Sequence, residues 1–141
     1  MATMKARAVM LMMIIVVAGA ASCTLPPAGL AQQRGQQTFD RVCATCHGAD
    51  ARGNGPVAEM FAVPVPDLTR IAARRGGAFP KDEIFRIIDG QSDMAAHGTR
   101  RMPVWGYEFF GAQPDDRKAH HEAVRKIEDL VEYLGSIQQA D

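Results

Sequence analysis

A stripe of apolar positions predicts one long amphipathic helix over residues 115–138. The positions recur at spacings of three and four residues and are Val124, Ile127, Leu130, Val131, Leu134 and Ile137. This recurrence matches the period of an α-helix, about 3.6 residues per turn, so these side chains share one face. Asp115 and Asp116 begin the segment, and negative charge is favourable at a helix N-terminus. The pattern therefore predicts a helix that packs its apolar face against a core.

Shorter helices are predicted upstream. Residues 32–42 place Gly35 and Phe39 on one face, and residues 80–89 follow Pro80 with an apolar face that ends at Gly90. A short helix over residues 57–62 would end before Pro64, while residues 49–56 and 91–107 have the composition of loops. No segment alternates with the period of a β-strand. The chain is thus predicted to be all-α with long loops, and loops of this length need something to organise them.

The N-terminal segment has the pattern of an export signal. Lys5 and Arg7 precede an apolar run over residues 9–20, and small residues follow it. Cleavage after Ala31 would make residues 1–31 the leader and 32–141 the mature domain. Cleavage before Cys23 would instead give a lipoprotein with an acylated Cys23, although the match to that signal is loose. A transmembrane anchor is a further alternative, since the uncharged stretch continues to Gln33, but the apolar run is shorter than the about 20 residues that span a bilayer.

Charge and composition exclude some classes of protein. The 141 residues carry 16 basic and 16 acidic side chains, so the formal net charge is zero. Removal of the leader takes away two basic residues and leaves a net charge of −2. The chain lacks the excess of basic residues that would indicate nucleic-acid binding. Its small net charge should also give only weak long-range electrostatic steering toward a partner. The length, with 47% hydrophobic residues, suits one globular domain.

The chain contains the pattern C-x-x-C-H, in which Cys43 and Cys46 precede His47. This is the attachment pattern of c-type haem. Two thiols one helical turn apart can add to the two vinyl groups on one edge of the macrocycle, and the adjacent imidazole can then ligate the iron. The alternatives are a thioredoxin-like pair, half of a zinc site or a small disulfide loop. They lack, respectively, a βαβ pattern, a second ligand pair and favourable geometry.

From these residues outward, residues 32–139 resemble the small bacterial class I c-type cytochromes. The matching strings are Cys-Ala-Thr-Cys-His-Gly at 43–48, Gly-Asn-Gly-Pro at 53–56, Pro-Asp-Leu-Thr at 66–69 and Met-Pro-Val-Trp-Gly at 102–106, with Gly35, Phe39, Leu130 and Tyr133 in support. The resemblance implies a class I cytochrome c fold, with three main helices and long loops around one covalently bound haem. It implies that Gly35 lets the first and last helices approach and that Phe39 packs near Leu130 and Tyr133. It also implies that the carbonyl of Pro56 accepts the Nδ1–H of His47.

Met102 is the expected second axial ligand of the iron. It precedes Pro103, which stiffens the loop, and a thioether ligand raises the reduction potential. Met94 and His97 in the same loop are rivals, and an open position is a further alternative. Trp105 is expected to pack against the haem or to donate to a propionate. The remaining candidates are surface residues by default, with a propionate or a docking partner as the alternative for the arginines: Arg70, Arg74, Arg75, Arg100, Arg101, His120 and His121.

These expectations lead to a periplasmic single-haem electron carrier rather than an enzyme. Iron with two axial ligands has no position for substrate, so it can only gain or lose an electron. The partners would be a redox donor and a redox acceptor, and lipidation of Cys23 would add a membrane tether. A permanently docked subunit of a larger oxidoreductase is an alternative, as is, with an open iron position, a five-coordinate peroxidase or gas sensor. The sequence does not distinguish a monomer from a subunit.

Overall fold

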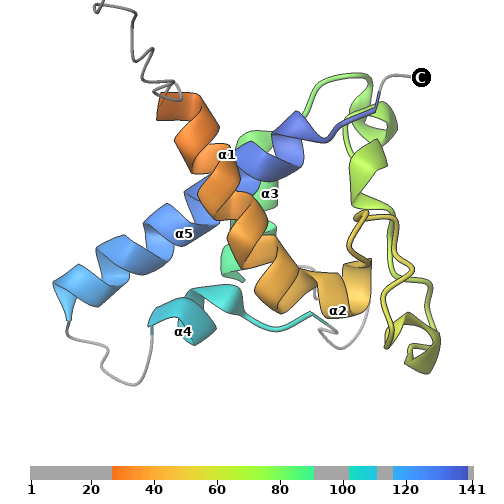
Figure 1. Ribbon diagram of the computed structural model, residues 1–141, viewed down its shortest axis with the longest axis horizontal. Coiled ribbons are helices and arrows are strands. Elements are labelled where there is room, and N and C mark those ends of the chain that lie inside the picture. The colour runs from red at the N-terminus through yellow and green to blue at the C-terminus, as the bar shows by residue number, and fades with distance from the viewer. Residues whose placement is uncertain (1–26, 91–101, 111–115, 140–141) are drawn as a thin grey trace, which may run out of the picture.

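In a computed structural model, which describes residues 27–90, 102–110 and 116–139, the regular elements of the protein are helices joined by loops (Figure 1). The helices are α1 (Pro27–Thr38), a π-helical turn (Phe39–Cys43), α2 (Ala44–His47), α3 (Lys81–Asp89), α4 (Trp105–Phe110) and α5 (Arg117–Ser136). Three short 3₁₀ turns lie at Ala58–Met60, Leu68–Arg70 and Ala73–Arg75. No strand occurs among these residues, which confirms the all-α class. Residues 1–26, which include Cys23, lie outside the described residues, as do Met94, His97, Arg100 and Arg101.

Helix α1 lies across α5, and this crossing is the main tertiary contact (Figure 1). Gly35 is buried at the crossing, where a Cβ atom would overlap the carbonyl oxygen of Asp129 and lie 2.8 Å from Cβ of Tyr133. One turn further on, the buried Phe39 ring lies 5.4 Å from the Tyr133 ring, and Leu130 is 1% exposed beside it. The expected close approach at Gly35 and the packing of Phe39 are both confirmed.

An ion pair closes the same crossing. Arg34 on α1 donates from Nε and an Nη to the two carboxylate oxygens of Asp129, at 2.6 and 2.8 Å. The Asp129 side chain is only 9% exposed, whereas that of Arg34 is 52% exposed. A nearly buried carboxylate needs its partner because water cannot replace it fully.

We expect Asp129→Asn to lower the thermal unfolding midpoint, because the amide would present a donor to the Arg34 guanidinium. The matched control is Glu132→Gln. Glu132 lies on α5 like Asp129, but its ion pair with Lys81 of α3 is exposed. Exposed pairs contribute little, so this control should stay close to the wild type. Calorimetry of the two variants checks the difference, and equal midpoints would show that burial does not distinguish the two pairs.

The core is built on the apolar face of α5. Ile127, Leu130, Val131 and Leu134 are buried as expected, and Asp116 caps the helix by accepting from the backbone N–H groups of Lys118 and Ala119. Val124 is only half-buried, and Ala123 takes its place in the core. Helix α3 adds its own buried side chains, Ile84 and Ile88, and ends at Gly90, whose φ of 91° is left-handed. Helix α3 is thus confirmed.

Two expected boundaries were wrong. Helix α1 begins at Pro27, five residues before the expected start, and proline is well suited to a first helical position. The loop expected to reach residue 107 ends earlier, because α4 begins at Trp105. Trp105 and Phe109 are one turn apart and their rings stack at 5.5 Å, while Gly106 lies against Asp89 at the end of α3. No helix among the described residues has the length and apolar character needed to cross a membrane.

Candidate haem site

The two cysteines and the histidine of the C-x-x-C-H pattern lie on one continuous helical stretch. Cys43 ends the π-helical turn, and Cys46 and His47 lie on α2. The π turn is closed by the backbone N–H of Ala44, which donates to the carbonyl of Phe39. Both cysteines are half-buried free thiols. Their spacing of three residues places them about one helical turn apart, as the pattern predicted.

The glycine-rich loop after α2 folds back along this helix. Its backbone N–H groups at Gly53, Gly55 and Val57 donate to the carbonyls of His47, Cys46 and Thr45, at 2.8, 3.2 and 3.2 Å. These are carbonyls that a helix end leaves without an internal partner. A Cβ atom on Gly55 would overlap the Thr45 carbonyl oxygen, so the loop approaches this closely only with glycine there. The loop therefore fixes the backbone of the C-x-x-C-H segment.

The partner of His47 differs from the expected one. Its Nδ1 lies 3.4 Å from the carbonyl oxygen of Pro66, and Pro66 rather than Pro56 takes the role of acceptor. The two residues that flank Pro56, Gly55 and Val57, donate their backbone N–H groups to carbonyls of α2. The chain then turns back, and Leu68 donates to the carbonyl of Ala51, which brings Pro66 to the imidazole. The sequence resemblance included the string Pro66-Asp67-Leu68-Thr69. However, no feature of the neighbouring residues identifies the carbonyl of Pro66 as the acceptor for His47.

The surroundings set the protonation of these groups. Burial lowers the pKa of the His47 imidazole, and the hydrogen bond to Pro66 opposes part of this effect. A neutral imidazole is the form that binds metals. Burial, with a smaller contribution from Cys46, raises the pKa of the Cys43 thiol to about 12, so this cysteine is protonated at neutral pH. Within the described residues His47 forms no hydrogen bond through Nε2, which leaves this nitrogen for a metal.

Half-buried apolar side chains surround the same core. Those that pack against the buried cluster are Cys43, Ala44, Leu68, Phe79, Phe85, Ile87, Met102, Trp105, Phe109 and Ile137. The structure thus brings Met102 and Trp105 to the core that Cys43 also contacts, although Cys43 lies far from both in the sequence. Side chains with one exposed face suit contact with a flat apolar group.

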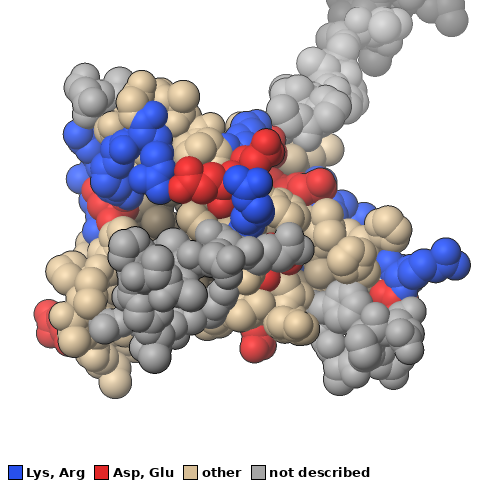
Figure 2. Space-filling view, turned by 180° about the vertical axis from the view of Figure 1, so that it is seen from behind, with Lys and Arg blue, Asp and Glu red and all other residues tan. Residues whose placement is uncertain are grey.

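Two of the candidate arginines, Arg74 and Arg75, bind groups within the protein. Figure 2 shows Lys and Arg gathered at the end of the molecule that carries residues 68–75, with acidic side chains among them. Arg74 donates to the carbonyl of Asp67 at 2.7 Å, and Arg75 forms an ion pair with Glu83. His120 and His121 are exposed on α5, as expected.

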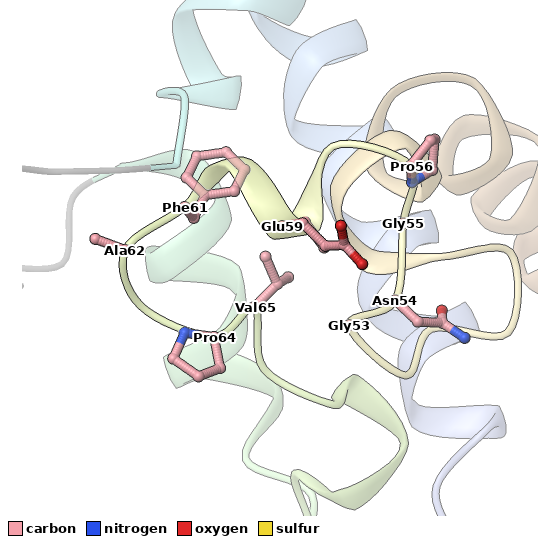
Figure 3. Close-up of a pocket in the computed structure, with 10 residues that line it drawn as sticks. Gly53, Asn54, Gly55, Pro56, Glu59, Phe61, Ala62, Pro64 and Val65 are labelled. Carbon is pink, nitrogen blue, oxygen red and sulfur yellow. The ribbon is translucent and has the colours of Figure 1, made fainter.

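A separate open hollow of about 630 Å³ lies within the loop of residues 53–65 (Figure 3). Its lining residues are Gly53, Asn54, Gly55, Pro56, Ala58, Glu59, Phe61, Ala62, Pro64 and Val65. Neither the two thiols nor His47 nor Met102 line it. The hollow lies on the loop, and its lining includes Gly53 and Gly55, whose N–H groups donate to the carbonyls of His47 and Cys46.

The residues present fit a covalently attached haem. Two thiols about one turn apart, not joined in a disulfide and followed directly by a histidine, are the groups that the attachment of haem c requires. The chain belongs to the family described as cytochrome c oxidase, cbb3-type, subunit III, whose model matches residues 30–119. This is a c-type cytochrome family, and its cofactor is covalently bound haem c with its iron. No match was found among curated proteins or among solved structures.

Proposed function

We propose that the protein is a periplasmic electron carrier with one haem, attached through Cys43 and Cys46 and ligated by His47 and Met102. The observation that carries the proposal is the orientation of His47, whose Nδ1 faces the Pro66 carbonyl beside two free thiols. The fold proposed with it is that of a class I cytochrome c, in which α1, α3 and α5 are the main helices around the haem. Redox partners, or membership of a larger complex, follow from the family.

The chain's own residues would hold and tune the cofactor. The haem iron, when bound, supplies reversible one-electron chemistry. Each thiol adds across a vinyl group, with sulfur bonding to one carbon and a hydrogen to the other, so no oxidant is needed. The Pro66 carbonyl holds the imidazole of His47 in one tautomer. Trp105 and the other half-buried apolar side chains exclude water from the macrocycle. The exclusion of water keeps the reorganisation energy of electron transfer small.

Met102 is proposed as the sixth ligand, and its removal tests the carrier function. Met102 packs against the same core as Cys43, and its thioether is a soft ligand suited to reduced iron. We expect the wild-type ferrous protein to ignore carbon monoxide and Met102→Ala to bind it. The variant should also lose the weak long-wavelength absorption band of ferric iron bound to sulfur.

Tyr107→Ala serves as the control, because Tyr107 follows Met102 by only five residues, is 77% exposed and should leave the spectrum unchanged. Rapid binding of carbon monoxide by the wild type would overturn the carrier function. It would favour a five-coordinate haem enzyme or gas sensor instead.

The mature domain is proposed to begin upstream of Pro27. Cleavage after Ala31, the expected site, would remove the first residues of α1, which packs against α5. Cleavage before Cys23 would leave α1 whole and make Cys23 the lipidated N-terminal residue. Lipidation there would tether the protein to a membrane.

A fixed subunit of an oxidase is the second candidate, because the matched family is described as such a subunit. The two roles differ in kinetics. A mobile carrier should be reduced by its donor in a second-order reaction that depends on salt. A subunit should instead co-purify with an oxidase at fixed stoichiometry.

A further inference from the structure

The side chain of Gln138, just beyond the end of α5, binds the segment that follows Pro66. Its Nε2 donates to the carbonyls of Leu68 and Leu134, at 2.8 and 2.7 Å, and its Oε1 accepts from the backbone N–H of Ala72 at 2.8 Å. The side chain is half-buried. Both polar atoms of the amide are thus used to hold the backbone of residues 68–72 against the end of α5.

Further contacts fix the residues between Gln138 and His47. The Asp67 carboxylate accepts from the backbone N–H and the hydroxyl of Thr69, at 2.8 and 2.6 Å. The N–H of Leu68 donates to Ala51, so the peptide groups on both sides of the Leu68 α-carbon are held. The proline ring also fixes φ of Pro66, which removes one of the two backbone rotations that place its carbonyl.

On the other side of Pro66, the carbonyl of Val65 packs closely against Gly53, where a Cβ atom would overlap its oxygen. The N–H of Gly53 donates to the carbonyl of His47 at 2.8 Å. One side of the segment thus lies against a residue bound to α2, and the other side is hydrogen-bonded to Gln138 at the end of α5.

We infer that Gln138 is a positioning residue for the haem ligand: it holds the Pro66 carbonyl against His47 and thereby lowers the reduction potential. This inference rests on the proposed function. A hydrogen bond that Nδ1–H donates makes the imidazole a stronger electron donor, which stabilises ferric iron relative to ferrous iron. Loosening the carbonyl weakens that bond. The midpoint potential should then rise.

The test compares Gln138→Leu with the wild type as haem-loaded proteins. We expect the midpoint potential of Gln138→Leu to rise, and the Nδ1–H proton of His47 to exchange faster with solvent in NMR spectra. Loss of a hydrogen bond made directly to a metal-binding side chain typically changes metal affinity by about tenfold or more. Because Gln138 acts through Pro66, the shift should stay below about tenfold in the redox equilibrium constant, which is 59 mV for one electron.

The matched control is Gln139→Ala. The side chain of Gln139 is exposed, and the residue binds the same segment through its backbone N–H, which donates to the carbonyl of Thr69 at 2.9 Å. The substitution keeps this N–H, so the midpoint potential of Gln139→Ala should equal that of the wild type. Where Gln138→Leu does not fold, Gln138→Met takes its place, because methionine is unbranched and of similar length.

The outcomes separate the two proposals. A wild type without covalent haem refutes the proposed function itself. A haem-loaded Gln138 variant with unchanged potential and unchanged exchange of the His47 proton refutes the positioning role alone. So do equal shifts in the Gln138 and Gln139 variants, and so does loss of haem from both Gln138 variants, which would make Gln138 a folding requirement.

Discussion

Replacing both Cys43 and Cys46 with alanine should abolish covalent haem attachment completely. The two thiols are the attachment atoms in our proposal, and each forms a carbon–sulfur bond that survives denaturation. Without them, haem can be held only through iron ligation and packing, and acid–acetone extraction removes it. The expected result is a colourless protein after extraction, whereas the wild type keeps its colour.

The single variants and the third cysteine complete this experiment. Cys43→Ala and Cys46→Ala should each keep at most one bond, which leaves one vinyl group intact and shifts the reduced absorption maximum to longer wavelength. Cys23→Ala is the control and should retain all of the haem. If the double variant keeps haem after extraction, the cofactor is attached elsewhere and the assignment of the site is wrong.

The second large effect is expected at the crossing of α1 and α5, where Gly35→Ala should destabilise the protein by about 2 kcal/mol or more. Helix propensity alone predicts the opposite sign, since alanine favours a helix over glycine by about 1 kcal/mol. However, the added Cβ would overlap the carbonyl oxygen of Asp129 and crowd Cβ of Tyr133. Backbone cannot move aside as a flexible side chain can, so the two helices must separate and the packing of Phe39 is lost with them.

Gly135→Ala is the matched control for this prediction. Gly135 lies on α5, and a Cβ atom there would lie 3.3 Å from Cδ1 of Phe79, whose half-buried ring can shift. This variant should be close to the wild type in its free energy of unfolding, measured by denaturant titration of the haem-loaded proteins. A neutral or stabilising Gly35→Ala would mean that the crossing is looser than described.

The helices with a clear apolar period were the predictable part of the fold. Helices α3 and α5 were found because their buried side chains recur with the period of a helix. Helix α4 was missed because it is only six residues long and Gly106 lies within it, so no period could be read. The early start of α1 was not predicted, because small residues such as Ala28 and Ala31 suit a signal cleavage site as well as a helix.

The site was predictable where its chemistry is local in the sequence. Cys43, Cys46 and His47 are neighbours on one helical turn, so their spacing carries the information. The acceptor for His47 is a backbone carbonyl 19 residues away, and any residue type can supply one. Its place depends on Gly53, Ala51 and Gln138, whose hydrogen bonds arise only once the chain has folded. Sequence reasoning therefore placed the role one loop too early, at Pro56.

Intact-mass spectrometry of denatured wild-type protein, produced in a host with a haem-attachment system, tests the central claim most directly. We predict a single species with the mass of the processed chain plus one haem, and a haem-bearing peptide that contains Cys43 and Cys46. The same mass identifies the mature N-terminus. The mass of the bare chain, or one lower by two hydrogens from a Cys43–Cys46 disulfide, would contradict the account.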